Sequence, residues 1–211
     1  MTSTPIILCP LRFEANALAP LERAGLATIQ CTGPGPKRIG QAVSACPDDR
    51  PLVLAGLATA LTAQIATGEA VWAERLCTVD ALPTLKLPPS ARRVPMCEVR
   101  AVLPNQPCRL AIAKATGAMV ADLECVAMAR AAHDRRSPWG VIRGISDDLN
   151  ADLPPVQHWI DANGDTRPRQ VAMWLALHPL RARRLLRLRD HATLAMANVY
   201  QALEEAITTL A

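Results

Sequence analysis

The chain has 211 residues, of which 50% are hydrophobic, 20% are charged and only 3% are aromatic. This length suits one α/β domain with an aliphatic core, and the composition excludes wholesale disorder and argues against the aromatic platforms that read RNA. The net charge of +4 equals the surplus of residues 179–191, which hold five arginines and Asp190, so the rest of the chain is neutral.

The first half of the chain alternates short apolar runs with stretches of helical spacing. A glycine and proline turn, Gly33-Pro34-Gly35-Pro36, interrupts this alternation, and the proline-rich residues 81–95 predict a surface loop. The expected strands are 6–9, 27–31, 52–55 and a strand or hairpin at 69–78, and the expected helices are 13–24 and about 38–45.

The second half continues the alternation and ends in a long helix. The expected strands are 96–103, 118–120 and 139–142, and the expected helices are 108–116, 124–133, 170–177 and 180–210, with residues 150–169 irregular. This order predicts a single α/β domain over residues 1–211 with a largely parallel sheet and a basic C-terminal helix at about 180–209.

Seven cysteines at irregular spacing, without a CxxC pair or a histidine at metal-ligand spacing, favour free thiols in a reducing cytosol. We therefore expect no disulfide framework and no metal site. The N-terminus lacks the basic region of a signal peptide, and the uncharged residues 51–68 are of marginal length for a bilayer span. A cytoplasmic protein without a transmembrane span is expected.

Ligands collect at the carboxyl ends of strands in such sheets, which directs attention to the residues that follow each predicted strand. Three carboxylates in these positions, Glu14, Glu124 and Asp147, could converge on one cleft. Each also has a plainer explanation, because Glu14 and Glu124 suit the first turn of a helix and Asp147 suits a turn.

Several segments carry a resemblance to a known family. Gly117-Ala118-Met119-Val120-Ala121-Asp122-Leu123-Glu124 and, further on, Val141-Ile142-Arg143-Gly144-Ile145-Ser146-Asp147 resemble the nucleoside phosphorylase superfamily. Thr32-Gly33-Pro34-Gly35-Pro36-Lys37 is similar to that family's Ser-Gly-x-Gly-Lys turn, and the region from Asp147 onward is similar to the hopanoid-associated phosphorylases, bacterial enzymes of the adenosylhopane step. The resemblance implies a three-layer α/β/α domain with a central mixed sheet, a homo-oligomer, and cleavage of the N-glycosidic bond of a purine nucleoside.

The resemblance also implies roles for individual residues. Asp147 would protonate N7 of the purine leaving group, and Ser146 would position that carboxyl group. Glu124 would bind the ribose hydroxyls and stabilise an oxocarbenium-like sugar, with Leu123 beneath the ribose. Glu14 would activate a water molecule or help to hold another nucleophile.

The chain departs from the family at the phosphate and base loop, where Gly56-Leu57-Ala58-Thr59-Ala60 replaces Gly-Ser-Ala-Gly-Gly. Gly56, Thr59 and Arg12 are the remaining candidates for binding inorganic phosphate, which would be the co-substrate of a phosphorylase; no other cofactor is expected. Val102 or Leu103 stands where an aromatic side chain would stack on the base. Phosphorolysis is therefore less well supported than cleavage in general, and an inactive relative that binds a nucleoside, a lipid or a hopanoid-pathway partner is the alternative.

The arginines of residues 181–189 allow two interpretations. Leu185, Leu188 and Leu194 predict an apolar face, so the helix would dock on the domain and leave a solvated basic face. Alternatively, the arginines would attach the protein peripherally to the anionic inner face of a membrane. Binding to nucleic acid is not expected.

Overall fold

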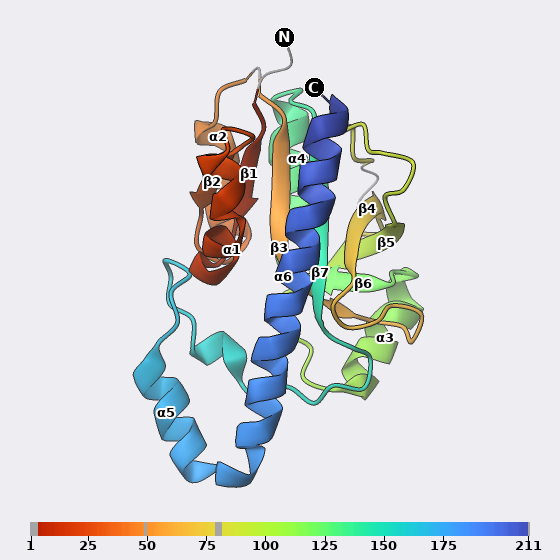
Figure 1. Ribbon diagram of the computed structural model, residues 1–211. Coiled ribbons are helices and arrows are strands. Elements are labelled where there is room, and N and C mark those ends of the chain that lie inside the picture. Colours follow the sequence, from red (N-terminus) through yellow and green to blue (C-terminus); the bar gives the residue numbers. More distant parts are fainter. Residues whose placement is uncertain (1–3, 49, 79–81, 211) are drawn as a thin grey trace.

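The structure is a computed structural model that describes residues 4–48, 50–78 and 82–210 (Figure 1). Its strands are β1 (Ile6–Cys9), β2 (Thr28–Cys31), β3 (Leu52–Ala60), β4 (Ala70–Leu76), β5 (Arg93–Glu98), β6 (Val120–Asp122) and β7 (Trp139–Asp147). Its helices are α1 (Arg12–Arg23), α2 (Pro36–Ala45), α3 (Gln106–Thr116), α4 (Cys125–Asp134), α5 (Pro168–Leu177) and α6 (Ala182–Leu210), with 3-10 turns η1 (Val156–His158) and η2 (Pro179–Arg181).

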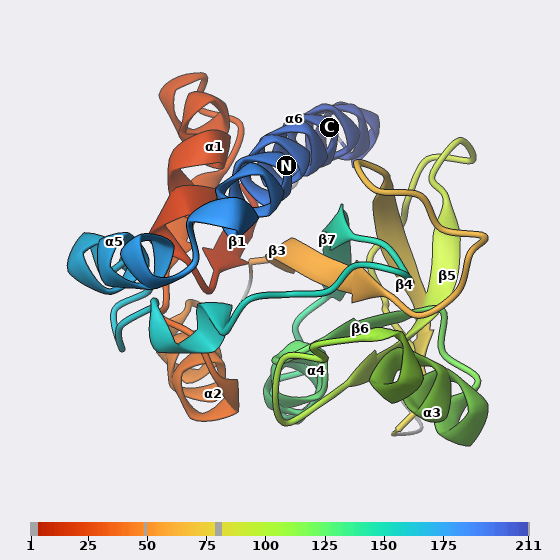
Figure 2. The same ribbon diagram turned by 90° about the horizontal axis from the view of Figure 1, so that it is seen from below.

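All seven of these strands belong to one mixed sheet with the order β2-β1-β3-β6-β5-β4-β7. Strand β7 also pairs with β3, so β3, β6, β5, β4 and β7 close into a ring, and β1 and β2 extend from it (Figure 2). Only the β3–β6 and β4–β7 pairings are antiparallel. The predicted largely parallel sheet is confirmed.

Helices cover the sheet on two sides, as the alternation of side chains along β1 shows. Leu8 packs in the core cluster that contains Ile39 of α2 and Met128 of α4. Its neighbour Ile7 packs instead with Leu18 of α1 and with Val199 of α6. Successive strand residues point to opposite faces, so a strand of this kind must be apolar throughout. The expected α/β/α fold with a central mixed sheet is thereby confirmed.

Strands β3 and β7 are longer than the predicted strands 52–55 and 139–142. They run parallel in unbroken register from Leu52 beside Trp139 to Ala58 beside Ile145, passing Gly56 beside Arg143. The prediction that Gly56–Thr59 forms a loop is therefore wrong. Gly56 pairs with Arg143, and Arg143 also pairs with Val71 of β4, and this pairing keeps both residues in extended backbone against their weak strand preference.

Strand β5 begins inside the segment predicted as a loop and ends before the predicted end of its strand. Pro95 lies within it, where the β4–β5 register shifts, and the Pro95 carbonyl accepts a hydrogen bond from Met119 N–H. A register shift accommodates a residue that has no N–H to donate. Strand β6 lies two residues beyond the predicted 118–120, which makes Asp122 its last residue.

The C-terminal helix docks through its second half, on a face that continues the one predicted from the partly buried Leu185 and Leu188 but does not include Leu194. Its buried residues are Ala195, Met196, Val199, Leu203, Ala206 and Ile207. Leu194, predicted on the docked face, is 52% exposed. The helix lies close to β7, because a Cβ on Gly144 would be 2.8 Å from the Ala195 carbonyl oxygen. Pro179 lies in the 3-10 turn before α6 rather than in its first turn.

Residues 51–68 form β3 and the turn that follows it. In the part of the chain that the structure describes, no helix combines the length and apolarity needed to cross a bilayer. All seven cysteines are free thiols.

Candidate active site

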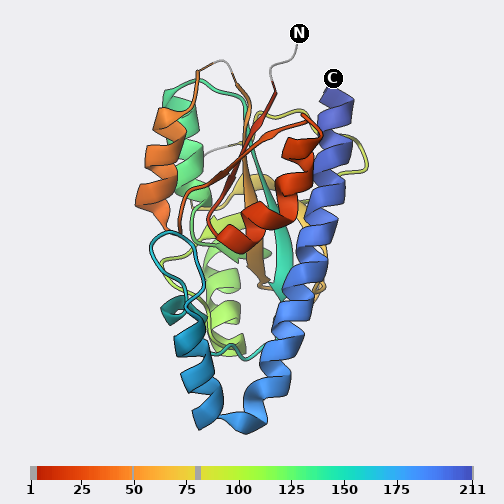
Figure 3. The same cartoon turned by 60° about the vertical axis from the view of Figure 1, so that its left-hand side comes forward.

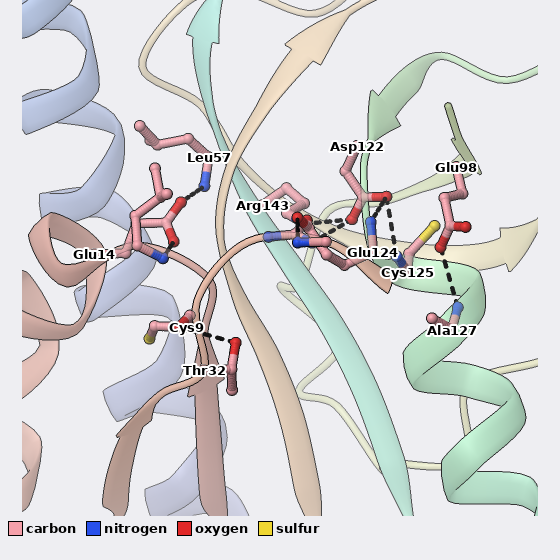
Figure 4. A network of polar contacts seen from close by, with 12 residues as sticks. Cys9, Glu14, Thr32, Leu57, Glu98, Asp122, Glu124, Cys125, Ala127 and Arg143 are labelled. Carbon is pink, nitrogen blue, oxygen red and sulfur yellow. Dashed lines mark hydrogen bonds and ion pairs between the residues drawn. The ribbon is translucent and has the colours of Figure 1, made fainter. Parts of the chain in front are cut away.

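A fully buried arginine organises the first of two polar centres. Arg143 lies in the middle of β7, and its Nε donates to Asp122 Oδ2 at 2.7 Å, while Nη2 donates to the same oxygen and lies 3.4 Å from Glu124 Oε2 (Figure 4). Asp122 ends β6, and Glu124 is the residue directly before α4. We call Arg143 and the carboxylates of Asp122, Glu124 and Glu14 the Arg143 centre.

Glu124 is also held by the glycine turn that follows β2. Its Oε1 accepts a hydrogen bond of 3.1 Å from Gly35 N–H, where the backbone has φ +101°. Gly33 has φ +79°, and a Cβ there would lie 2.3 Å from the Ala162 carbonyl oxygen, so this position requires glycine. The turn that is similar to the Ser-Gly-x-Gly-Lys turn of the nucleoside phosphorylases thus binds one of the protein's own carboxylates.

Glu98 fixes the helix that follows Glu124. Its Oε2 accepts hydrogen bonds from Val126 N–H at 2.8 Å and Ala127 N–H at 3.0 Å, which lie in the first turn of α4. A carboxylate at a helix N-terminus satisfies free amides and interacts favourably with the helix dipole. Glu98 therefore positions Glu124 through the backbone, although sequence reasoning did not select it.

Glu14 reaches the same centre from the first turn of α1. Its Oε2 accepts a hydrogen bond from Leu11 N–H at 2.8 Å, and its Oε1 accepts one from Leu57 N–H at 2.7 Å (Figure 4). A Cβ on Gly56 would lie 2.5 Å from Glu14 Oε1 and 2.7 Å from Arg143 Nη1. Glycine at this position therefore lets the carboxylate and the guanidinium approach each other.

Burial raises the pKa of both glutamates of this centre. The pKa of Glu14 is about 7, because desolvation outweighs the opposing effects of Arg143 and of the Leu57 and Leu11 amides. The pKa of Glu124 is also about 7, for the same reason, with Asp122 adding to the increase and Arg143 and Gly35 opposing it. One arginine facing three carboxylates leaves an excess of negative charge, which favours proton uptake near neutral pH.

The second centre lies at the end of β7. Asp147 Oδ1 accepts from Ser146 Oγ at 2.5 Å, and Oδ2 accepts from Thr59 Oγ1 at 2.7 Å and pairs with Arg109 Nη2 at 2.8 Å. The register between β3 and β7 shifts here, because β7 has one extra residue, Ser146. This shift lets the side chains of Ser146 and Thr59 both reach Asp147. Burial raises the pKa of Asp147, while Arg109, Ser146 and Thr59 oppose that increase. We call this group the Asp147 centre.

Arg109 is the functional candidate that sequence reasoning missed. It comes from α3, is fully buried, and also donates to the Leu103 carbonyl through Nε at 3.3 Å and Nη2 at 3.1 Å, and to the Asp148 carbonyl. Its acidic partner is 38 residues away in the sequence, so no local motif indicates the pair. The available signal was its spacing with Ile112 and Thr116, which places Arg109 on the inner side of the helix.

The other predicted site residues have varied environments. Arg12 is half exposed and pairs with Asp165 at 3.5 Å. Val102 and Leu103 lie in the loop after β5, and the Leu103 carbonyl contacts Arg109 beside Asp147. Leu123 is partly buried between Asp122 and Glu124.

The two centres follow one another along the same pair of strands. Arg143 and Asp147 are four residues apart on β7, about 13 Å along an extended chain, and Gly56 and Thr59 pair with them on β3. Ser146 and Asp147 also line a hollow of about 260 Å³ that α6 borders through Arg184, Arg187, Leu188 and His191. Among the described residues, no group of three or more His, Cys, Asp or Glu could hold a metal ion.

Solved structures share this architecture over the whole chain. An S-adenosylhomocysteine nucleosidase from Streptococcus pyogenes, in complex with 5-methylthiotubericidin, is 16% identical with a TM-score of 0.66 and covers 100% of this chain and 99% of its own. A Helicobacter pylori nucleosidase mutant with 5′-methylthioadenosine in the active site is 11% identical, with a TM-score of 0.69 and coverages of 99% and 100%. A futalosine hydrolase mutant from Helicobacter pylori is 10% identical, with a TM-score of 0.67 and coverages of 98% and 100%.

The chain has the fold of these nucleosidases. At such identities the likeness concerns the fold, and activity has to be argued from the site. No protein-family model matches the chain, and no curated protein matches its sequence.

Proposed function

We propose that this protein hydrolyses the N-glycosidic bond of a purine nucleoside. The observation that carries the proposal is the meeting of Glu14 and Glu124 around Arg143, with Asp147 four residues further along the same strand. The fold shared with purine nucleosidases and the Arg-Gly-Ile-Ser-Asp sequence of β7 support the same reaction class.

In this mechanism, the Asp147 centre supplies the proton that the leaving base needs. A carboxyl group near N7 of the purine donates its proton as the C–N bond stretches, so the base departs neutral. Burial favours the protonated form of Asp147, and the Ser146 and Thr59 hydroxyls fix its orientation. Arg109 acts in the opposite direction, so the balance between burial and Arg109 controls how much protonated acid is present.

The Arg143 centre binds the sugar and activates the nucleophile. A carboxylate at Glu124 accepts hydrogen bonds from ribose hydroxyls and stabilises the positive charge of an oxocarbenium-like transition state. Glu14, with a pKa of about 7, suits a general base that takes a proton from the attacking water at neutral pH.

Three observations favour water over phosphate as the acceptor. The Leu57 amide is bound to Glu14, the Thr59 hydroxyl is bound to Asp147, and Arg12 pairs with Asp165. Two of the three candidates for binding phosphate, Thr59 and Arg12, therefore already have partners within the chain, as does the amide next to the third candidate, Gly56.

For the substrate, we propose a purine nucleoside with an apolar 5′ substituent, of which adenosylhopane is the example that the tail of the sequence suggests. The hollow beside Asp147 supports this choice, because it extends toward α6 and includes the apolar Leu153, Pro154 and Leu188. The resemblance also implies a homo-oligomer, and the arginines of residues 181–189 suggest a peripheral membrane contact. Sedimentation velocity of the purified chain tests the first of these.

The test is release of adenine from adenosine, 5′-methylthioadenosine and adenosylhopane, each with and without phosphate. We expect release without phosphate and, in Asp147→Asn and Glu14→Gln, a rate lower by about 10²–10⁴-fold, which is the usual contribution of general acid–base catalysis. Asp134→Asn, at an exposed acid on α4, is the control. If no adenine is released, or if Asp147→Asn equals the wild type, the proposal is wrong.

A second function is favoured by one observation, the pairing of Asp147 with Arg109. This pair stabilises the ionised carboxylate and would suit a nucleoside-binding or lipid-binding protein without turnover, including a partner in a hopanoid-pathway assembly. Calorimetric binding of a nucleoside without adenine release would support this alternative.

A further inference from the structure

Helix α5 and the first part of α6 project beyond the body of the domain as a helical hairpin, which we define as residues 167–191 (Figures 1 and 3). Helix α5 has no buried residue, and the buried residues of α6 begin only at Ala195. Helix α5 is attached to the domain through Trp174, which stacks on His178 at the end of the helix at 4.8 Å and packs edge-on against the buried Trp159, outside the hairpin, at 5.3 Å. The hairpin therefore projects in a defined orientation from the carboxyl end of the sheet.

The end of the hairpin is apolar and exposed. Leu180, in the turn between the two helices, is 96% exposed, and Leu177 and Met173 are 71% and 63% exposed. Met173 and Leu177 are four residues apart on α5, so they share one face of that helix. Single exposed leucines are ordinary, but an apolar cluster at the end of a projection indicates a surface that meets a partner.

The charge of the hairpin identifies that partner as anionic. Residues 167–191 contain seven arginines and one acidic residue, a net charge of +6, which leaves the rest of the chain at −2. Arg181 and Arg183 lie one and three residues after Leu180, are exposed, and have no acidic partner within 4 Å among the described residues. An apolar end next to unpaired arginines matches a surface in which hydrocarbon lies beneath anionic headgroups.

The base of the hairpin borders the proposed active site. Arg184, Arg187 and Leu188 line the same hollow as Ser146 and Asp147. A molecule held at the hairpin would therefore have a direct path to Asp147.

We propose that the α5–α6 hairpin docks on an anionic lipid bilayer, with Leu177 and Leu180 inserted and Arg181 and Arg183 at the headgroups. The hollow at Asp147 then opens toward the membrane, so a nucleoside with an apolar tail can react while its tail stays in lipid. The statement about the tail rests on the proposed function, whereas the docking itself does not.

The experiment measures co-sedimentation of the purified protein with vesicles of phosphatidylcholine alone and of phosphatidylcholine with 30% phosphatidylglycerol. We expect at least tenfold stronger binding to the anionic vesicles, weakened by added salt. Two double variants should each lower this binding at least tenfold: Leu177→Ser/Leu180→Ser and Arg181→Gln/Arg183→Gln. The matched controls, Leu82→Ser and Arg23→Gln/Arg75→Gln, change exposed residues outside the hairpin and should bind like the wild type.

Equal binding to both vesicle types, absence of binding, or equal losses in the control variants would overturn the proposal. So would a wild-type oligomer, seen by sedimentation velocity, that the hairpin variants dissociate while vesicle binding is unchanged, because the hairpin would then contact a second copy. Adenine release from soluble 5′-methylthioadenosine is measured in parallel and should not change in the hairpin variants. Vesicle binding without adenine release refutes only the proposed function, and adenine release without vesicle binding refutes only the docking.

Discussion

The Arg143 centre and the Asp147 centre use the same elements in different proportions. Each sets a buried arginine against buried carboxylates, but Arg143 faces Asp122, Glu124 and Glu14, whereas Arg109 faces Asp147. The first centre has an excess of negative charge and holds two glutamates with a pKa of about 7. The second is a one-to-one pair strengthened by two hydroxyl groups. Burial raises the pKa of the acids in both centres; Asp122 adds to this increase in the Arg143 centre, whereas Ser146 and Thr59 oppose it together with Arg109 in the Asp147 centre.

The largest expected effect comes from removing each arginine in turn. Arg143→Met should lower the free energy of unfolding by about 3–5 kcal/mol, because breaking a buried ion pair leaves uncompensated charge. Arg109→Met should cost less, because it leaves the single carboxylate of Asp147, which Ser146 and Thr59 still bind, whereas Arg143→Met leaves three carboxylates. Urea unfolding of both variants at pH 7 measures the difference, and equal losses would show that the two centres do not differ in this way.

Gly56→Ala should disturb the Arg143 centre alone. The new Cβ would lie 2.5 Å from Glu14 Oε1, so Glu14 or Arg143 must move, at a cost of about 1–3 kcal/mol. Gly40→Ala is the matched control, because Gly40 lies within α2 with open space around its Cβ, and alanine there should stabilise the helix slightly. Thermal unfolding compares the two, and an unchanged Tm for Gly56→Ala would contradict the close approach.

The raised pKa of Glu14 predicts how stability depends on pH. Between its ordinary value of 4.5 and about 7, the folded state keeps a proton that the unfolded state releases, so this group makes the free energy of unfolding fall as pH rises. Glu14→Gln removes this contribution. The free energy of unfolding should then decrease less steeply with pH, by at most about 1.4 kcal/mol per pH unit. Urea titrations from pH 4.5 to 8 check this, with the exposed Glu74→Gln as control. Identical slopes in wild type and Glu14→Gln would mean that the Glu14 pKa is not raised.

The smallest effect is expected at Thr59. Its hydroxyl donates to Asp147 and so lowers the pKa of that acid, and Thr59→Val should raise it. The loss of a hydrogen bond worth about 1 kcal/mol corresponds to about 0.7 on the pH scale. In the pH–rate profile, activity is lost at high pH as Asp147 deprotonates. The pH at which this loss occurs should rise by that amount. Thr208→Val, an exposed threonine of α6, is the control, and a decrease in this pH would contradict the contact.

Prediction from sequence succeeded where structure is local. The apolar run at β1 and the helical spacing of α1 and α4 are properties of neighbouring residues, and they predicted the α/β order of elements correctly. The predicted strand boundaries were wrong at Gly56, Pro95 and Arg143, because pairing with a neighbouring strand overrides the local preference of a residue.

The residues of the candidate site could be predicted from local sequence, but their contacts with one another could not. Glu14, Glu124 and Asp147 could be selected from the sequence, because they follow apolar strand segments where ligands collect. The contact of Glu124 with Gly35 joins residues 89 apart, and that of Asp147 with Arg109 joins residues 38 apart. Contacts between residues so far apart in the sequence cannot be predicted from a local sequence pattern.

The sequence by itself determined which residues can carry charge into the core and in what order the elements follow. Only the tertiary structure decided which arginine faces which carboxylate, and that the basic segment and α5 project together as a hairpin. The reason is physical. The pKa of a buried acid depends on the charges and hydrogen-bond donors within a few ångströms, and those neighbours come from strands and helices that only folding brings together.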